Sequence, residues 1–129
     1  MIELPPPAVE LLRGRNLAHL ATLNRDGSVQ VTPVWVDVED GEAVFNTAEG
    51  RVKWRNMRRD PRITIEVTDH SDPDRYVMIR GRAEMTRDGA NEHIERLSWK
   101  YDGAPFASYE EGVARVKVYV HADQVHIGQ

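Results

Sequence analysis

Apolar and polar residues alternate along much of the first half of the chain, which predicts extended strands. Residues 17–23 are rich in apolar side chains and lead into Asn24-Arg25-Asp26-Gly27, a typical turn sequence, after which residues 29–38 form a second extended segment. The two segments together predict a β-hairpin. A further turn at Glu39-Asp40-Gly41 leads to a short third strand at residues 43–46.

The two-residue period returns in the second half of the chain. Residues 63–67, 77–85 and 116–120 predict three more strands, because small or apolar residues occupy every second position in each. Six predicted strands joined mostly by tight turns favour a small antiparallel barrel over a parallel α/β sheet. We therefore expect a mainly β fold with short helices.

Three segments predict helices. Residues 8–12 form a short apolar stripe after a triple proline, which suits a first helical turn. Residues 48–59 contain good helix formers, with Thr47 as a candidate cap and Asp60-Pro61 as a stop. Apolar residues recur at helical spacing between Asp88, another candidate cap, and Gly103. No repeat or linker interrupts the pattern, so we expect residues 1–129 to form a single domain with a loop at residues 102–112.

The composition narrows the class of protein. With 129 residues, 40% of them hydrophobic and 29% charged, the chain suits one ordinary globular domain with a real core. No apolar run approaches the roughly 20 residues that cross a bilayer, and the N-terminus lacks a basic region followed by an apolar stretch, so we expect a cytoplasmic protein. The absence of cysteine excludes disulfides, a thiolate nucleophile and cysteine-based metal sites.

A local reversal of charge is the sharpest feature of the sequence. The net charge is −4, but residues 51–62 contain six basic residues and one acidic residue, so this segment carries +5 and the remainder carries −9. Free backbone N–H groups and the dipole at a helix start favour an anion, and Arg51 and Lys53 lie in the first turn. The segment is therefore a candidate phosphate site, with a solvated helix face as the alternative.

A proline interrupts the second extended segment. Pro33 has no N–H group to donate to a neighbouring strand. The valines before it occupy odd-numbered positions and those after it occupy even-numbered positions, so the side of the strand that carries the valines changes near Pro33. A bulge or an unpaired edge is predicted here, with backbone groups free to meet a planar ligand. Trp35 could wall the ring of such a ligand, or be a buried structural tryptophan.

The usual signatures of acid–base or nucleophilic catalysis are missing. The five histidines show no paired metal-ligand spacing, so we expect no metal site. No serine lies in a nucleophile-elbow sequence, and no P-loop or GxGxxG sequence occurs. The pattern predicts a binding site without an assignable catalytic residue, which suits an enzyme whose cofactor carries the chemistry.

Several short motifs together resemble a known family. They are Leu20-Ala21-Thr22-Leu23, Asp26-Gly27, Thr32-Pro33-Val34-Trp35, Asn46-Thr47, Gly50-Arg51-Val52-Lys53, Arg59-Asp60-Pro61-Arg62 and Arg80-Gly81-Arg82-Ala83. This set resembles the pyridoxamine-phosphate-oxidase-like split β-barrel family, especially its actinobacterial branch that uses the deazaflavin coenzyme F420. The resemblance covers residues 8–125, but the substrate segment of true pyridoxamine phosphate oxidases, at their C-terminus, is missing, so we do not expect vitamin B6 synthesis.

The resemblance implies a six-stranded antiparallel split β-barrel of the FMN-binding type, assembled as a homodimer with cofactor sites at the interface. It implies that Arg51 and Lys53 grip the cofactor phosphate. Supporting residues on the phosphate side would be Thr47, Asn56 and Arg59. The ring of the cofactor would be lined by Thr32, Pro33, Val34 and Trp35. Tyr76 would reach a site from the partner subunit.

Four functions remain open from the sequence. The leading hypothesis is an F420-dependent oxidoreductase that transfers a hydride to a small organic acceptor. The alternatives are an FMN-dependent oxidoreductase on the same barrel and a non-catalytic protein that binds or stores F420 or flavin. A nucleic-acid-binding module ranks last, because Trp54 is the one aromatic residue within the basic segment that is available for base stacking.

Overall fold

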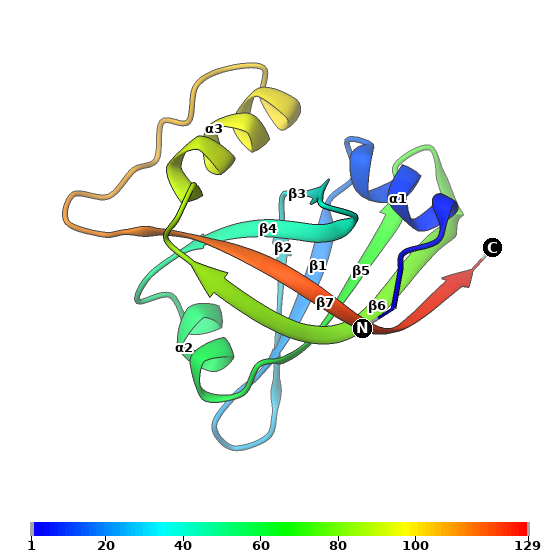
Figure 1. The fold of residues 1–129 in the computed structure, drawn as a ribbon, viewed down its shortest axis with the longest axis horizontal. Coiled ribbons are helices and arrows are strands. Elements are labelled where there is room, and N and C mark those ends of the chain that lie inside the picture. Colours follow the sequence, from blue (N-terminus) through cyan, green and yellow to red (C-terminus); the bar gives the residue numbers. More distant parts are fainter. Residues whose placement is uncertain (1, 129) are drawn as a thin grey trace.

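The computed structural model describes residues 2–128 and shows a curled antiparallel sheet of seven strands with three helices around it (Figure 1). In chain order the elements are α1 (Pro6–Arg13), β1 (Ala18–Leu23), β2 (Val29–Val34), β3 (Val36–Glu39), β4 (Glu42–Ala48), α2 (Val52–Arg59), β5 (Arg62–Asp69), β6 (Asp72–Thr86), α3 (Ala90–Tyr101) and β7 (Arg115–Gly128). The strand order is β2-β1-β5-β6-β7-β4-β3. The predicted mainly β, antiparallel fold with short helices is confirmed.

The sheet has seven strands instead of the predicted six, because the segment 29–38 breaks at Trp35. Its first part, β2, pairs with β1 at one edge of the sheet, and its second part, β3, pairs with β4 at the other edge. Of the two alternatives predicted at Pro33, the structure has the edge and not the bulge: Pro33 lies on the edge strand β2, where a residue without an N–H group is tolerated. One short segment thus supplies both edges of the sheet.

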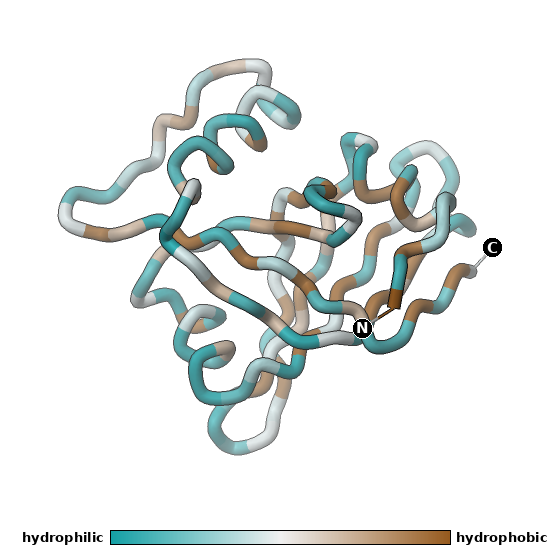
Figure 2. Tube along the Cα trace, in the orientation of Figure 1, coloured by the Kyte–Doolittle hydropathy of each residue, from teal (hydrophilic) through white to brown (hydrophobic). Residues whose placement is uncertain are grey.

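The hydrophobic core fills the inside of the curl. Fully buried residues from the strands include Leu20, Phe45, Ile65 and Val118. Figure 2 shows hydrophobic residues along the strands and along one side of α1, which covers one end of the sheet. Two adjacent α1 leucines, residues 11 and 12, are also fully buried, and each contributes about 1.5–3 kcal/mol by leaving water.

The basic helix begins later than the sequence indicated. Residues 48–51 are not helical: Ala48 ends β4, and Gly50 turns the chain with a φ of +90°. Thr47 was predicted to cap the helix, but it is a buried residue of β4. Arg51 takes the N-cap position of α2 without a side-chain capping hydrogen bond. The prediction was wrong because the apolar β4 pairs with β7 as far as Ala48, and this pairing holds residues 47 and 48 extended.

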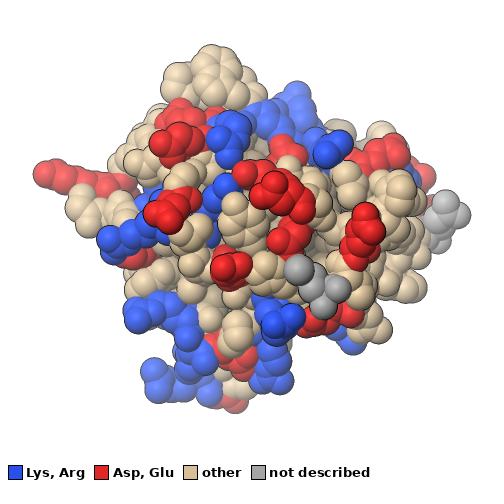
Figure 3. All heavy atoms as spheres, viewed as in Figure 1, with Lys and Arg blue, Asp and Glu red and all other residues tan. Residues whose placement is uncertain are grey.

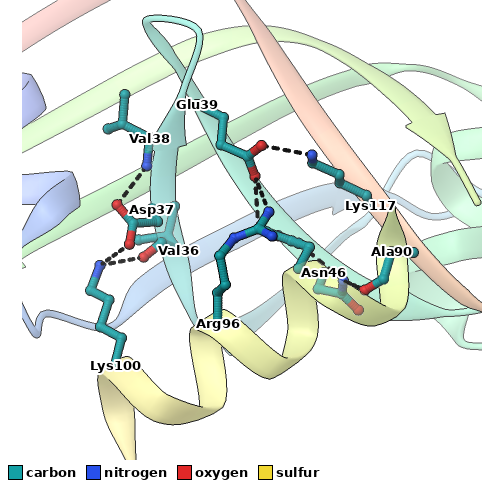
Figure 4. Close-up of polar contacts among 10 residues, drawn as sticks. Val36, Asp37, Val38, Glu39, Asn46, Ala90, Arg96, Lys100 and Lys117 are labelled. Carbon is teal, nitrogen blue, oxygen red and sulfur yellow. Dashed lines mark hydrogen bonds and ion pairs between the residues drawn. The ribbon is translucent and has the colours of Figure 1, made fainter. Parts of the chain in front are cut away.

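Helix α3 covers the outer face of β4 and β7 (Figure 1). It starts after Gly89, which has a φ of +70°, so Asp88 is not its cap. The end of the helix is anchored to the first half of the chain. The Tyr101 hydroxyl donates to the Asn16 carbonyl at 2.6 Å, and Lys100 Nζ donates to the Val36 carbonyl at 2.6 Å (Figure 4).

Strands β6 and β7 form a long ladder with one irregularity. The register shifts after Arg80, and a Cβ atom added at Gly81 would lie 2.2 Å from the carbonyl oxygen of His121. On β7, the imidazole of His121 lies between the carboxylates of Glu42 and Glu84, at 2.6 Å from each. Hydrogen bonds to these carboxylates raise the pKa of His121. No helix within residues 2–128 is long and apolar enough to span a membrane.

Candidate functional site

A pocket of about 350 Å³ opens where the end of β4, the start of α2, α3 and the junction between β2 and β3 meet. Its apolar side includes Pro33, Val34 and Trp35 from the junction, together with Ile94 and Leu97 from α3. Its polar side carries three cations, Arg51, Lys53 and Arg115. The pocket therefore joins an apolar wall to a positively charged end.

The three cations meet because of the β4–β7 ladder. Arg115, the first residue of β7, pairs with Ala48, the last residue of β4, and the chain then turns into α2. Arg51 at the N-cap and Lys53 in the first turn of α2 consequently lie near Arg115. Figure 3 shows Lys and Arg atoms gathered over the part of the surface where α2 lies in Figure 1.

The positive charge in the pocket is poorly compensated. Lys53 is half-buried and makes no ion pair with the described residues 2–128. Burial lowers the pKa of Lys53, and the nearby charges of Arg51 and Arg115 lower it further. Burial, followed by Arg51, also lowers the pKa of Arg115. Of the three cations, only Arg51 forms an ion pair within the described residues: its Nη2 lies 3.3 Å from Glu110 Oε1, and both side chains are solvent-exposed. Cations held this close together without enough counter-charge favour a bound anion.

The apolar wall is stiffened by aromatic stacking. The rings of Trp35 and Tyr101 are stacked, with centroids 5.4 Å apart and planes 4° from parallel. Trp35 is half-buried and lines the pocket, so it packs against Tyr101 in the fold and also exposes part of its ring to the pocket; its contact with a ligand stays a prediction. Because the hydroxyl of Tyr101 is hydrogen-bonded to the backbone, the wall is held rigidly in place.

The loop after α3 forms the remaining side of the pocket. Phe106 and Ser108 line it, and the guanidinium carbon of Arg115 lies 5.0 Å from the centre of the Phe106 ring. Glu95 of α3 holds this loop, since its carboxylate accepts the Phe106 N–H at 3.1 Å and the Tyr109 hydroxyl. No histidine, aspartate or glutamate within residues 2–128 lines the pocket. Its chemistry is therefore that of a binding site with fixed positive charge.

The structure brings six of the ten residues predicted for the site into one pocket. These six are Pro33, Val34, Trp35, Thr47, Arg51 and Lys53. The other four are Thr32, Asn56, Arg59 and Tyr76, and they lie outside its lining.

Two of these four residues make contacts within the fold. The amide of Asn56 is buried and donates to Thr22 Oγ1 at 3.0 Å and to Asn24 Oδ1 at 2.9 Å. Arg59 donates to the Leu23 carbonyl. Both residues therefore tie α2 to the β1–β2 hairpin.

Thr32 and Tyr76 lie in different parts of the molecule. The hydroxyl oxygen of Thr32 is buried without a hydrogen-bond partner among the described residues. Tyr76 lies near the end of the β6–β7 ladder, against Gly128 and 6.0 Å from the His126 ring. Its predicted contact with a partner subunit stays a prediction.

Sequence reasoning missed Arg115, Asn46 and Phe106. Arg115 precedes a strand of alternating valines, so the sequence alone could have placed it on the face of the strand opposite to Val116. The sequence could not show that Arg115 lies near Arg51, because this proximity depends on which strand pairs with β7. Asn46 belongs to the Asn46-Thr47 motif of the family resemblance but was given no role in the site, and Phe106 carried no signal that separates it from an ordinary loop residue.

Comparison with known proteins identifies the family of the chain. The family model described as pyridoxamine 5′-phosphate oxidase matches residues 4–126. Among solved structures, an F420 reductase shares 27% identity, with a TM-score of 0.84 over 95% of this chain and 98% of that one. A conserved hypothetical protein from Mycobacterium tuberculosis shares 24% identity, with a TM-score of 0.76 over 100% of this chain and 86% of that one. General stress protein 26 from Bacillus anthracis shares 14% identity, with a TM-score of 0.71 over 95% and 91%. The last two share the fold alone, and the predicted split-barrel fold class is confirmed.

Proposed function

Because the chain belongs to the pyridoxamine 5′-phosphate oxidase family, we propose that it is an oxidoreductase that binds the deazaflavin coenzyme F420 and transfers a hydride to a small organic acceptor. The observation that carries this proposal is the uncompensated charge of Lys53, beside Arg51 and Arg115, at one end of a pocket with an aromatic wall. The similarity to an F420 reductase supports the choice of coenzyme.

The charged end of the pocket fits a phosphate group. Arg51, Lys53 and Arg115 present nitrogen donors, and the free N–H groups at the start of α2 add a favourable dipole. Each charge-assisted contact contributes about 1.5–3 kcal/mol, so three contacts together contribute about 4.5–9 kcal/mol toward binding, before the costs of association are subtracted. A phosphate would also relieve the repulsion among the three cations.

The apolar end fits a flat ring system. Trp35 is held parallel to Tyr101, and Pro33 and Val34 lie beside it on the same wall. When bound, the coenzyme would supply the hydride chemistry, and the residues of this chain would hold its ring and phosphate in place.

FMN is the second candidate cofactor, because one phosphate and one flat ring suit the same two ends of the pocket. Titration of the purified protein with oxidised F420 and, separately, with FMN separates the two candidates. Tight F420 binding with weak FMN binding supports the proposal, and turnover with a panel of electron-poor acceptors then distinguishes an enzyme from a storage protein. The opposite preference indicates a flavin enzyme, and binding of neither refutes the proposal.

We further propose a homodimer in which the partner subunit completes each site. Val29 and Val31 on the edge strand β2 are 55% and 59% exposed, and Leu17, on the pocket lining, is 48% exposed. This apolar surface adjoins the pocket and is suited to a second copy of the chain. Sedimentation should give a dimer, and a monomer with cofactor bound would contradict the interface site.

A further inference from the structure

Two contacts hold the guanidinium group of Arg115 where it lines the pocket. Its Nε donates to Asn46 Oδ1 at 2.9 Å, and the face of its guanidinium lies over the Phe106 ring. Among residues 2–128, no acceptor takes a hydrogen bond from its two terminal nitrogens. These nitrogens are therefore left to face an anion, and their two parallel N–H groups match two oxygens of a phosphate.

The orientation of the Asn46 amide is fixed from both ends. Its Nδ2 lies 3.0 Å from the carbonyl oxygen of Ala90, which can only accept, and 3.0 Å from Nδ1 of His93 (Figure 4 shows Asn46 against Ala90). At the other end, Arg115 can only donate, so the atom facing it must be the amide oxygen. The two constraints agree, because a flipped amide would place its oxygen against the Ala90 carbonyl and its NH₂ group against the Arg115 donor.

His93 can accept from Asn46 only while it is neutral. The Asn46 amide donates to Nδ1, so the imidazole carries its proton on Nε2, which lies 3.8 Å from Glu39 Oε2. His93 is fully buried, and burial lowers its pKa to about 4 against the opposing effect of Glu39. The cations Lys117, Arg96 and Arg115 face the same imidazole and lower the pKa further.

Glu39 is itself occupied by stronger partners. Its carboxylate pairs with Lys117 Nζ at 2.8 Å and with Arg96 Nη2 at 3.1 Å, as Figure 4 shows. Two cations hold the carboxylate ionised and reduce its pull on a proton of His93. The buried imidazole therefore stays neutral, and its Nδ1 remains an acceptor.

We infer that His93 and Asn46 are positioning residues that orient Arg115 for a phosphate-bearing ligand, through the chain His93 Nδ1, Asn46 amide and Arg115 Nε. The inference rests on the proposed function, since it concerns the same pocket. His93 is a buried residue of α3 that lies outside the pocket lining, so it can act on the pocket only through Asn46. Its contribution to binding is to keep the Asn46 oxygen turned toward Arg115.

The test is a matched pair of substitutions at His93. In His93→Asn, the side-chain oxygen takes the place of Nδ1 and still accepts from Asn46, whereas in His93→Gln the replacement group reaches the place of Nε2 and the acceptor is lost. Affinity for F420, FMN and inorganic phosphate should stay within about 3-fold of wild type in the first variant and fall about 10-fold in the second. Equal losses in both variants would overturn the inference.

Repeating the His93→Gln substitution in an Arg115→Lys variant distinguishes a positioning role of His93 from a general destabilisation of the fold. In Arg115→Lys the Nε donor is absent, so adding His93→Gln should cause no further loss of affinity if His93 acts through Arg115. An equal loss with and without Arg115→Lys would assign His93 a merely structural role. If His93→Gln does not fold, Asn46→Ser replaces it in the same cycle.

A readout without any ligand keeps this inference separate from the proposed function. In the ¹⁵N spectrum, the Arg115 Nε–H should be protected from solvent exchange in wild type and in His93→Asn, and exposed in His93→Gln. If wild type binds none of the three ligands, the proposed function fails, and the Arg115 signal still decides the positioning role. An unprotected Nε–H in wild type would overturn the inference directly.

Discussion

Replacing Lys53 with methionine should weaken anion binding and, at the same time, stabilise the protein without ligand. Methionine keeps an apolar stem of similar length and removes only the charge. In the free protein, this charge is half-buried, lacks an acidic partner and lies near Arg51 and Arg115. With a phosphate bound, the same charge becomes a favourable contact. The two states should therefore respond to the substitution in opposite directions.

Both effects can be given a magnitude. Loss of one charge-assisted contact of about 1.5–3 kcal/mol corresponds to about 10- to 150-fold weaker binding. Relief of the like-charge repulsion should raise the free energy of unfolding of the ligand-free protein by about 0.5–1 kcal/mol, a gain of a few degrees in Tm. The gain should shrink at high salt, because partly exposed charges are screened. Calorimetric titration with F420 and FMN and thermal unfolding without ligand measure the two effects.

Arg58→Met is the matched control for this prediction. Arg58 lies on the same helix, is exposed over the Trp54 ring at 4.7 Å, and does not line the pocket, so its loss changes the net charge equally. Binding by this variant should stay within about 2-fold of wild type, as expected for a screened surface charge. If Lys53→Met binds as tightly as wild type, or if both variants lose affinity equally, the anion site is not at Lys53.

Three further predictions follow from single contacts. Glu110→Gln should strengthen phosphate binding by about 2- to 5-fold, because the carboxylate no longer competes for Arg51; weaker binding would show that Glu110 supports the site. Gly81→Ala should lower the free energy of unfolding by about 1–3 kcal/mol in urea denaturation, since the new Cβ meets the backbone of His121; unchanged stability would contradict this close approach. Hydrogen bonds that the imidazole donates to Glu42 and Glu84 raise the pKa of His121, so the stabilisation from these bonds is complete below the unfolded pKa of about 6.5 and is lost as the pH rises through the folded pKa. Wild type should therefore lose a fraction of a kcal/mol more stability than His121→Gln between about pH 6 and pH 9, and parallel pH profiles would refute the assignment.

The predicted strands and helices were mostly right because their signals are local. Alternating apolar residues gave the strands 17–23, 63–67 and 77–85, and helical spacing gave α1 and α3. The errors lie where tertiary pairing overrides local preference. Residues 48–51 have the composition of a helix, but the pairing of β4 with β7 holds Ala48 extended and delays the helix to Val52.

The sequence by itself determined the mainly β fold and the concentration of positive charge at residues 51–62, because each is encoded by neighbouring residues. The tertiary structure alone decided which of those charges share a pocket. Arg51 and Lys53 meet Arg115, more than 60 positions away, since β4 and β7 are neighbours in the sheet, whereas Arg59, on the same basic helix, turns toward the β1–β2 hairpin. A strand shows its buried face through its own alternation, but its pairing partner is set by the packing of the whole sheet.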